Sequence, residues 1–374
     1  AEPGTQQALL PDWAFGANPD ALRYGQMIGT ESFAERFARR IAGFGPALET
    51  QVPGIPSALG TMLVGAGLWR SGLLQGSWPR ARCLALARKL ALIALPPLVL
   101  LMLLDMWTGF TGAVVGPVAN RIAGAEMEIG GIRHQLDQNE AGRTTLHSGV
   151  AGYSGRNWRF TNVTPTRCRL ELHHPDGLGG IPGNIDASVT YTIDTAGHLE
   201  IEMTGAADQP TYFNPAFHGY WNLSGSADLS DHRLMVPATS YLPVDDAQLP
   251  LGAPVSVAGS EFDYRHARAI GPVLDHNFCL SQGGDQMVLA CRLSTQRLQL
   301  DVLTDQPGVQ LYNGAHIDTG ADLDVDGGSY GPHAGLAIEP QFWPDTPHHP
   351  EYPDCLLLPE KPVRYRSRFE LRRI

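Results

Sequence analysis

The spacing of apolar residues changes near residue 110 of the chain. Ahead of that point Phe33, Phe37 and Ile41 recur at intervals of four, as on one face of a helix. Ser32 and Glu35, which open this stretch, have the spacing of a helix capping box. Beyond residue 110 apolar and polar residues alternate instead, as in half-buried strands. The sequence therefore predicts a helical segment over 1–110 and a separate β domain over 111–374.

Within 111–374 many short alternating runs are separated by turn residues. The pair Gly130-Gly131 between two such runs is a signal for a two-residue hairpin. The clearest runs are Met127–Ile129, Ile132–Leu136, Cys168–Leu172, Val189–Ile193, Leu199–Met203, Leu298–Val302 and Val363–Leu371. Many short strands with one buried face predict a mainly β domain, built as an antiparallel sandwich or barrel.

Residues 58–104 contain the segments best suited to a membrane. Leu90–Leu104 is almost wholly apolar and follows two basic residues, but it is shorter than a spanning helix and contains Pro96-Pro97. A buried helix in a water-soluble protein is the alternative. Residues 24–104 also loosely resemble the C-terminal part of an uncharacterised bacterial multi-pass membrane family, through Tyr24-Gly25, Ser32–Glu35 and Gly60–Leu74. Membrane association through 58–104 is thus one of two open interpretations.

The charge and the cysteine content of the chain exclude several classes of function. The chain has 27 basic and 38 acidic residues, a formal net charge of −11, which disfavours nucleic acid as a partner. Its five cysteines include no C-x-x-C pair, so we expect neither a disulfide framework nor a zinc ribbon. Free thiols are typical of a reducing compartment, and we expect a cytoplasmic protein.

The common sequence motifs for cofactor and metal binding are absent or incomplete in this sequence. The sequence has no P-loop, no dinucleotide-binding glycine motif after a strand and no G-x-S-x-G elbow. Residues 322–327 imitate the start of a calcium loop, but position twelve is His333 where a glutamate is required. Two pairs of adjacent histidines occur, His173-His174 and His348-His349. Neighbours on a strand point to opposite faces, so neither pair should bind one metal ion together. We therefore expect no metal and no organic cofactor.

A few polar residues lie within otherwise apolar stretches of the sequence. Burying a polar side chain there is costly unless the group is paired or functional. Glu339 follows Leu-Ala-Ile and is the clearest case. The others are Asn120, Arg121, His147, His218 and Asp275. Aromatic residues lie close by in sequence at Tyr220, Trp221, Phe342 and Trp343. Polar groups for hydroxyls and aromatic faces for C–H groups together predict a sugar site.

These residues lie in motifs that resemble the aldose 1-epimerase (galactose mutarotase) family from about residue 112 to 374. The matching strings, in family order, are Asn120–Ala123, Thr145–Gly149, Asn214–Gly225, Leu274–Phe278, Pro307–Tyr312 and Ala337–Asp345. The resemblance implies an antiparallel β-supersandwich that binds a free monosaccharide. It also implies that the first strands of the family fold are missing, because the helical segment 1–110 occupies their place.

The resemblance further implies a role for each site residue. Glu339 would be the base and His218 the acid that open the sugar ring, supported by His147. Arg121 and Asp275 would hold sugar hydroxyls, with Asn120 and Gln341 as weaker candidates. Two alternatives remain open: a non-catalytic carbohydrate-binding or regulatory module of the same fold, and a membrane-anchored fusion protein. Neither the preferred aldose nor the oligomeric state follows from the sequence.

Overall fold

The computed structural model describes residues 110–280, 284, 286–320 and 329–374 of the chain. The expectations for 1–109 (the helices, the capping box and the apolar run Leu90–Leu104) lie outside the described residues, as does the turn 322–327. Within the described residues, no helix is both long enough and apolar enough to cross a membrane.

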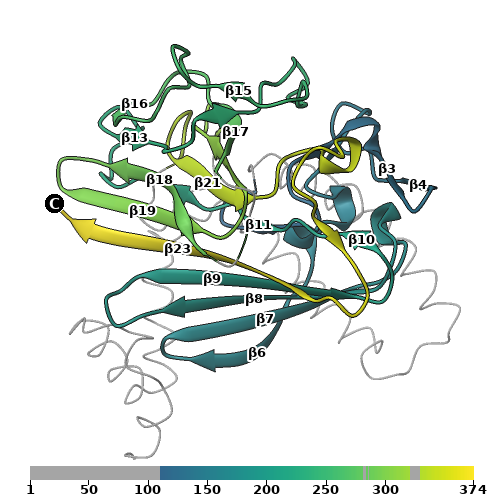
Figure 1. Ribbon diagram of the computed structural model, residues 1–374. Coiled ribbons are helices and arrows are strands. Elements are labelled where there is room, and N and C mark those ends of the chain that lie inside the picture. The colour runs from purple at the N-terminus through teal and green to yellow at the C-terminus, as the bar shows by residue number, and fades with distance from the viewer. Residues whose placement is uncertain (1–109, 281–283, 285, 321–328) are drawn as a thin grey trace, which may run out of the picture. The chain divides into compact units, whose positions relative to one another are not determined.

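The largest sheet in the described part of the chain has nine strands and is antiparallel throughout. Figure 1 shows its long strands side by side, with the C-terminal strand β23 between β19 and β9. In order across the sheet the strands are β16 (Arg268–Ala269), β13 (Arg233–Met235), β18 (Val288–Ser294), β19 (Leu298–Thr304), β23 (Val363–Arg373), β9 (Leu199–Ala207), β8 (Ile185–Ile193), β7 (Arg167–His174) and β6 (Arg159–Thr164).

The second sheet of the described residues has six strands and is also antiparallel. In order they are β12 (Tyr220–Trp221), β21 (Leu336–Gln341), β20 (Gly308–Tyr312), β17 (Asp275–Cys279), β14 (Ser240–Tyr241) and β15 (Val255–Ser256). Three of these strands, β17, β20 and β21, lie next to one another and contain three of the family-like motifs.

Short antiparallel pairs and single-turn helices complete the described part. The pairs are β1 (Val114–Val115) with β11 (Ala216–Phe217), β2 (Arg121–Ile122) with β5 (Thr145–Leu146), β3 (Glu126–Ile129) with β4 (Ile132–Gln135), and β10 (Thr211–Tyr212) with β22 (Leu356–Leu357). The 3₁₀ helices are η3 (Ala123–Ala125), η4 (Gly149–Ala151), η5 (Tyr153–Gly155), η6 (Leu178–Gly180) and η7 (Thr346–His348). The predicted mainly β, antiparallel architecture is confirmed.

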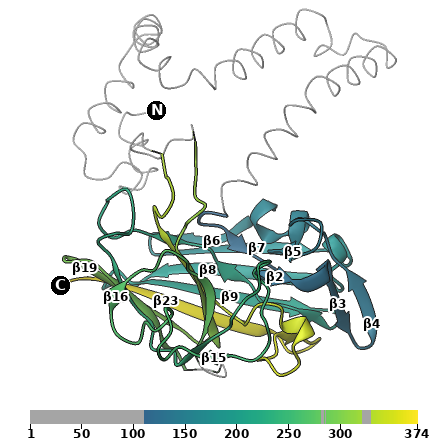
Figure 2. The same cartoon turned by 90° about the horizontal axis from the view of Figure 1, so that it is seen from above.

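The hairpin expected around Gly130-Gly131 is present at one end of the domain, where both ribbon views show β3 and β4 (Figures 1 and 2). Ile129 pairs with Ile132, and the two glycines between them have φ values of 59° and 82°. Two consecutive positive φ angles define a type I′ turn, which glycine adopts without steric cost. The glycine pair therefore sets the register of this hairpin.

One hydrophobic core joins the two large sheets. The six-stranded sheet contributes Leu311 and Ile338, and the nine-stranded sheet contributes Ile201 and Leu300 to the same cluster, all fully buried. Because side chains alternate along a strand, the residues next to Leu311 and Ile338 point away from this core. Tyr312 and Glu339 are thereby presented on the opposite face of the six-stranded sheet.

Candidate active site

A pocket of about 260 Å³ collects most of the polar residues predicted to form the site. Six of the seven line it: Asn120, Arg121, His147, His218, Asp275 and Glu339. They come from segments far apart in the chain, namely the β2–β5 pair, the turn after β11, and strands β17 and β21. The seventh, Gln341, is fully buried and does not line the pocket.

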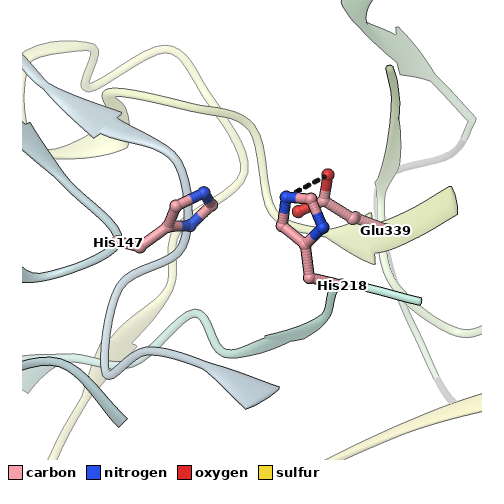
Figure 3. A group of neighbouring side chains, drawn as sticks. All are labelled: His147, His218 and Glu339. Carbon is pink, nitrogen blue, oxygen red and sulfur yellow. Dashed lines mark ion pairs between the residues drawn. The ribbon is translucent and has the colours of Figure 1, made fainter. Parts of the chain in front are cut away.

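His218 and Glu339 are in direct contact within this pocket. The Nε2 atom of His218 lies 3.4 Å from Oε1 of Glu339, and the two side chains are 7% and 2% exposed (Figure 3). Glu339 Oε2 and His218 Nδ1 are buried and have no hydrogen-bond partner in the described part of the chain. A histidine and a carboxylate at this separation can exchange a proton and can also face one small ligand together.

Burial opposes charge on both members of the pair. Desolvation lowers the pKa of His218 to about 4. Desolvation also raises the pKa of Glu339 well above its ordinary value, and the charge of Asp275 adds to this rise, while Arg121 opposes it. With no ligand bound, the pair is therefore favoured as a neutral histidine and a protonated glutamic acid, one proton in all, rather than as an ion pair.

His147 faces His218 across the pocket, with 5.4 Å between the ring centroids (Figure 3). The backbone N–H of Asn120 donates to Nδ1 of His147 over 3.1 Å. Because that nitrogen accepts, the neutral ring must carry its proton on Nε2. Burial, followed by the charges of His218 and Arg121, lowers the pKa of His147 well below its ordinary value. His147 is thus a neutral hydrogen-bond donor.

The backbone around His147 is held in an unusual conformation. His147 and Ser148 have φ values of 52° and 66°, in the left-handed region. The Ser148 hydroxyl accepts from the Val118 N–H at 2.9 Å and donates to the Val118 carbonyl at 3.0 Å, which ties the turn to the segment before β2. A Cβ atom on Gly152 would collide with the His147 carbonyl oxygen, so glycine is required there.

Arg121 is fixed by a carboxylate that the sequence analysis did not single out. Its Nε and one terminal nitrogen each donate to Glu140 over 2.8 Å, a two-bond arrangement of high directionality. Thr144 also donates to Glu140, over 2.9 Å. The guanidinium lies 3.9 Å from Asp275 on its other side. Glu140 stands in a polar turn, where its sequence context gives no signal, although a largely buried arginine does require such a partner.

Asp275 is held by a second residue missing from the predicted set. The amide of Gln310 donates to Asp275 Oδ1 over 2.6 Å. Gln310 stands directly opposite Glu339 in the pairing of β20 with β21, so both side chains share one face of the sheet. Gln310 belongs to one of the family-like strings, which is the signal that could have identified it.

The aromatic residues at the pocket differ from those expected. Tyr220 lines it, as predicted, together with Phe110 and Tyr312. The other three expected aromatic side chains pack elsewhere: Trp221 on Phe369, Phe342 on Tyr365 and Trp343 on Tyr352. Trp221 follows Tyr220 on the same strand and must point to the opposite face. Phe110 meets the His147 ring edge-on, with 4.6 Å between the centroids.

Metal binding needs separate consideration, because ligand atoms of His147, His218 and Glu339 all lie within 4.8 Å of one another. An imidazole that binds a metal through Nε2 normally donates from Nδ1 to an acceptor. In His147 the Nδ1 atom accepts from a backbone N–H, which is the opposite arrangement. The donor set therefore does not fit a metal ion, and we derive no step through one.

The two adjacent histidine pairs behave differently from each other. His173 is exposed and His174 is buried, as alternation along strand β7 requires. In the second pair His348 is the last residue of the 3₁₀ helix η7 and His349 follows it, and both rings lie at the carboxylate of Asp345. The expectation of opposite faces is therefore wrong for the second pair.

Comparison with known proteins identifies the family of the chain. The family model described as aldose 1-epimerase matches residues 97–370. Galactose mutarotase from Mus musculus is 36% identical over 272 residues, which make up 70% of this chain and 78% of that protein. Aldose 1-epimerase from Escherichia coli K12 is 34% identical over 267 residues, or 67% of this chain and 76% of that protein.

Solved structures show the same relationship at the level of the fold. An aldose epimerase homologue from C. elegans superposes with a TM-score of 0.66 at 26% identity, covering 71% of this chain and 83% of that chain. Galactose 1-epimerase from Lactobacillus acidophilus NCFM superposes with a TM-score of 0.60 at 29% identity, covering 71% and 80%. The mainly β fold, the polar pocket and these similarities together show that the chain belongs to the aldose 1-epimerase family.

Proposed function

We propose that the protein interconverts the α and β anomers of a free aldose such as glucose or galactose, with Glu339 as base and His218 as acid. The contact between these two side chains carries the proposal. Mutarotation takes a proton from the anomeric hydroxyl and delivers one to the ring oxygen, and both oxygens are bonded to the same carbon. An acid and a base that serve them must lie close together at one end of the sugar, as this pair does.

The active form of the pair holds one proton, on His218, while Glu339 is ionised. Glu339 removes the anomeric proton, the electrons of that O–H bond form the aldehyde C=O, and the bond from the anomeric carbon to the ring oxygen breaks. His218 delivers its proton to that ring oxygen. After rotation about the first carbon–carbon bond, the same steps run in reverse with the roles exchanged, so the enzyme ends with its proton on His218. The cycle requires no cofactor.

The remaining pocket residues bind and orient the sugar in this proposal. His147 donates from Nε2 toward the developing charge at the ring-oxygen side. Arg121 and Asp275, which lie 3.9 Å apart, hold hydroxyl groups. Asn120 contributes mainly through its backbone N–H to His147, and Gln341, which lies away from the pocket, has no assigned contact with sugar. The rings of Tyr220 and Tyr312 supply apolar surface for the C–H groups of the sugar.

We also propose that the β domain lacks the first strands of the family fold. About a fifth of the mouse relative lies outside the aligned region. At one edge of the nine-stranded sheet, every residue of β6 is exposed. Its apolar residues Phe160 and Val163 are 65% and 62% exposed, which is unusual for a strand whose neighbours contribute to the core. Strands that cover this edge in complete members of the fold would account for both observations.

Polarimetry of freshly dissolved α-glucose and α-galactose tests the proposed reaction. We expect the optical rotation to reach its equilibrium value much faster with the protein than in buffer alone. A rate equal to that of buffer, combined with sugar binding measured by calorimetry, would instead identify a carbohydrate-binding module without turnover.

A further inference from the structure

Asp345 connects the strand that contains Glu339 to the strand that contains Arg121. It follows β21 after three residues, is 4% exposed, and has a φ of 57°. Its backbone N–H donates to the Arg121 carbonyl over 3.1 Å. Its side-chain Oδ1 accepts from the Ala123 N–H over 2.9 Å. One residue thus holds the main chain on both sides of residue 122.

This contact completes the support of Arg121. On one side, the main chain at Arg121 pairs with Leu146 in the β2–β5 ladder. On the other side, Asp345 bonds the Arg121 carbonyl and the Ala123 N–H from a distant segment, in addition to the local bonds that Asn120 and Glu126 make to residues 121 and 123. The next two residues, Gly124 and Ala125, have positive φ values, so the chain turns away immediately after this anchor. Asp345 thus helps to fix the main chain from which the Arg121 side chain extends toward Glu140 and Asp275.

Among the described residues, only histidines lie within ion-pair distance of the Asp345 carboxylate. His348 Nδ1 lies 2.7 Å from Oδ1, and His349 Nε2 lies 3.6 Å from Oδ2. No lysine or arginine of the described part lies within ion-pair distance of this carboxylate. The His348 side chain is 34% exposed and can therefore exchange its proton with solvent.

We propose that Asp345 is a positioning residue that acts through Arg121, and that the protonated form of His348 holds the Asp345 carboxylate in place. The inference rests on the proposed function, because it takes Arg121 as a ligand of a sugar hydroxyl. Loss of the contact is expected to weaken sugar binding while the acid and the base themselves stay intact.

The direction of the pH effect follows from the surroundings of His348. Its hydrogen bond to Asp345 raises the pKa of His348 above the ordinary value of 6.5, and the charges of Asp345 and Glu126 add to this, while burial opposes it. Glu126 is itself paired with Arg133 at 3.6 Å, and His349 also contacts Glu351 at 3.2 Å. Because the pKa of His348 is raised in the folded protein, its protonated form stabilises the contact fully below pH 6.5. That stabilisation is lost as the pH rises through the raised pKa.

The first test compares Asp345→Ala, Asp345→Asn and Arg121→Ala by steady-state polarimetry. We expect Asp345→Ala to raise KM about fivefold or more with a smaller change in kcat, as for one lost buried hydrogen bond. Asn retains an acceptor for the Ala123 N–H and should restore much of the binding. In the Arg121→Ala background Asp345→Ala should change KM no further.

Two results separate the inference from the proposed function. If Arg121→Ala leaves KM unchanged, the sugar-binding role of Arg121 is wrong and the inference falls with it. If Arg121→Ala raises KM but Asp345→Ala adds its full effect in that background, the proposed function stands and the role of Asp345 is wrong. A change in melting temperature with unchanged KM would also overturn it.

His348→Gln tests the pH dependence in a protein that keeps Asp345. In the wild type we expect KM to rise from slightly acidic to alkaline pH as His348 loses its proton. In His348→Gln this additional rise should be absent, and KM at acidic pH should already match the alkaline value of the wild type. Identical KM profiles for the two proteins would contradict the proposal.

Discussion

The Nε2 atom of His218 and the Oε1 atom of Glu339 lie 3.4 Å apart. Burial lowers the pKa of His218 and raises the pKa of Glu339, so that the pKa of the carboxyl group becomes the higher of the two. In water a carboxylic acid loses its proton before an imidazolium does. In this pocket the order is reversed. A bound sugar that hydrogen-bonds to both groups can shift the shared proton from Glu339 to His218 without any exchange with solvent.

The first prediction concerns the pH profile of turnover. The active pair holds one proton, so activity falls when a second proton is added and when the last one is lost. Because burial lowers the pKa of His218 to about 4, the acid limb of kcat/KM should lie near that pH, with a plateau at neutrality. Polarimetric rates across the pH range measure this. An acid limb at the ordinary histidine value of 6.5, or a flat profile, would contradict the shared-proton account.

The second prediction separates the two histidines. His218→Ala should lose nearly all turnover, whereas His147→Ala should lose somewhat less, within the roughly 10²–10⁴-fold range of a positioned acid or base. His147→Gln should retain more activity than His147→Ala, because the glutamine amide can still donate where Nε2–H does. Equal losses in the Gln and Ala variants would show that donation from His147 is unimportant.

The third prediction concerns Glu140, which lies outside the pocket lining. Glu140→Gln removes the charge that fixes Arg121, and we expect KM to rise about tenfold with kcat less affected, since hydrogen bonds between charged groups are the stronger kind. The exposed pair Arg159 and Glu171, 2.9 Å apart, provides a matched control. Glu171→Gln should leave KM unchanged. If both variants behave alike, Arg121 does not depend on Glu140.

The fourth prediction concerns residues 1–109. The described residues that line the pocket all lie at or beyond Phe110, and so do all the residues proposed to act on the sugar, so deleting 1–109 removes none of these groups. We expect the truncated protein to bind sugar but to be less soluble. The membrane interpretation of 58–104 predicts that the full chain sediments with membranes after a high-salt wash. Recovery of the full chain in the supernatant would favour the alternative, a buried helix.

The sequence predicted the β architecture well, because alternation is a local signal. Strands β7, β8, β9, β19 and β23 lie where apolar residues alternate with polar ones, and the Gly130-Gly131 turn specifies its own hairpin. Polar residues within apolar stretches likewise singled out His218 and Glu339, which the structure then shows in contact, because a buried charge needs a function or a partner.

Other features depend on contacts between distant segments and gave no local signal. Glu140 is recognisable only through its contact with Arg121. Phe110 is far in sequence from most of the other residues that line the pocket, so its place there could not be predicted. Trp343 was wrongly expected at the pocket, since proximity in sequence to Glu339 does not decide which face a side chain occupies. His348 and His349 were expected to alternate as on a strand. His348 instead ends a 3₁₀ helix, and both rings contact Asp345.

The most direct test of the central claim is the polarimetric rate of Glu339→Gln. The substitution preserves shape but removes the base, so we expect the protein to fold and to bind sugar within an order of magnitude of the wild type. Turnover should fall by about 10²–10⁴-fold, the usual contribution of a positioned base. A folded Glu339→Gln protein with the wild-type rate would show that Glu339 is not the base and that the proposed mechanism is wrong.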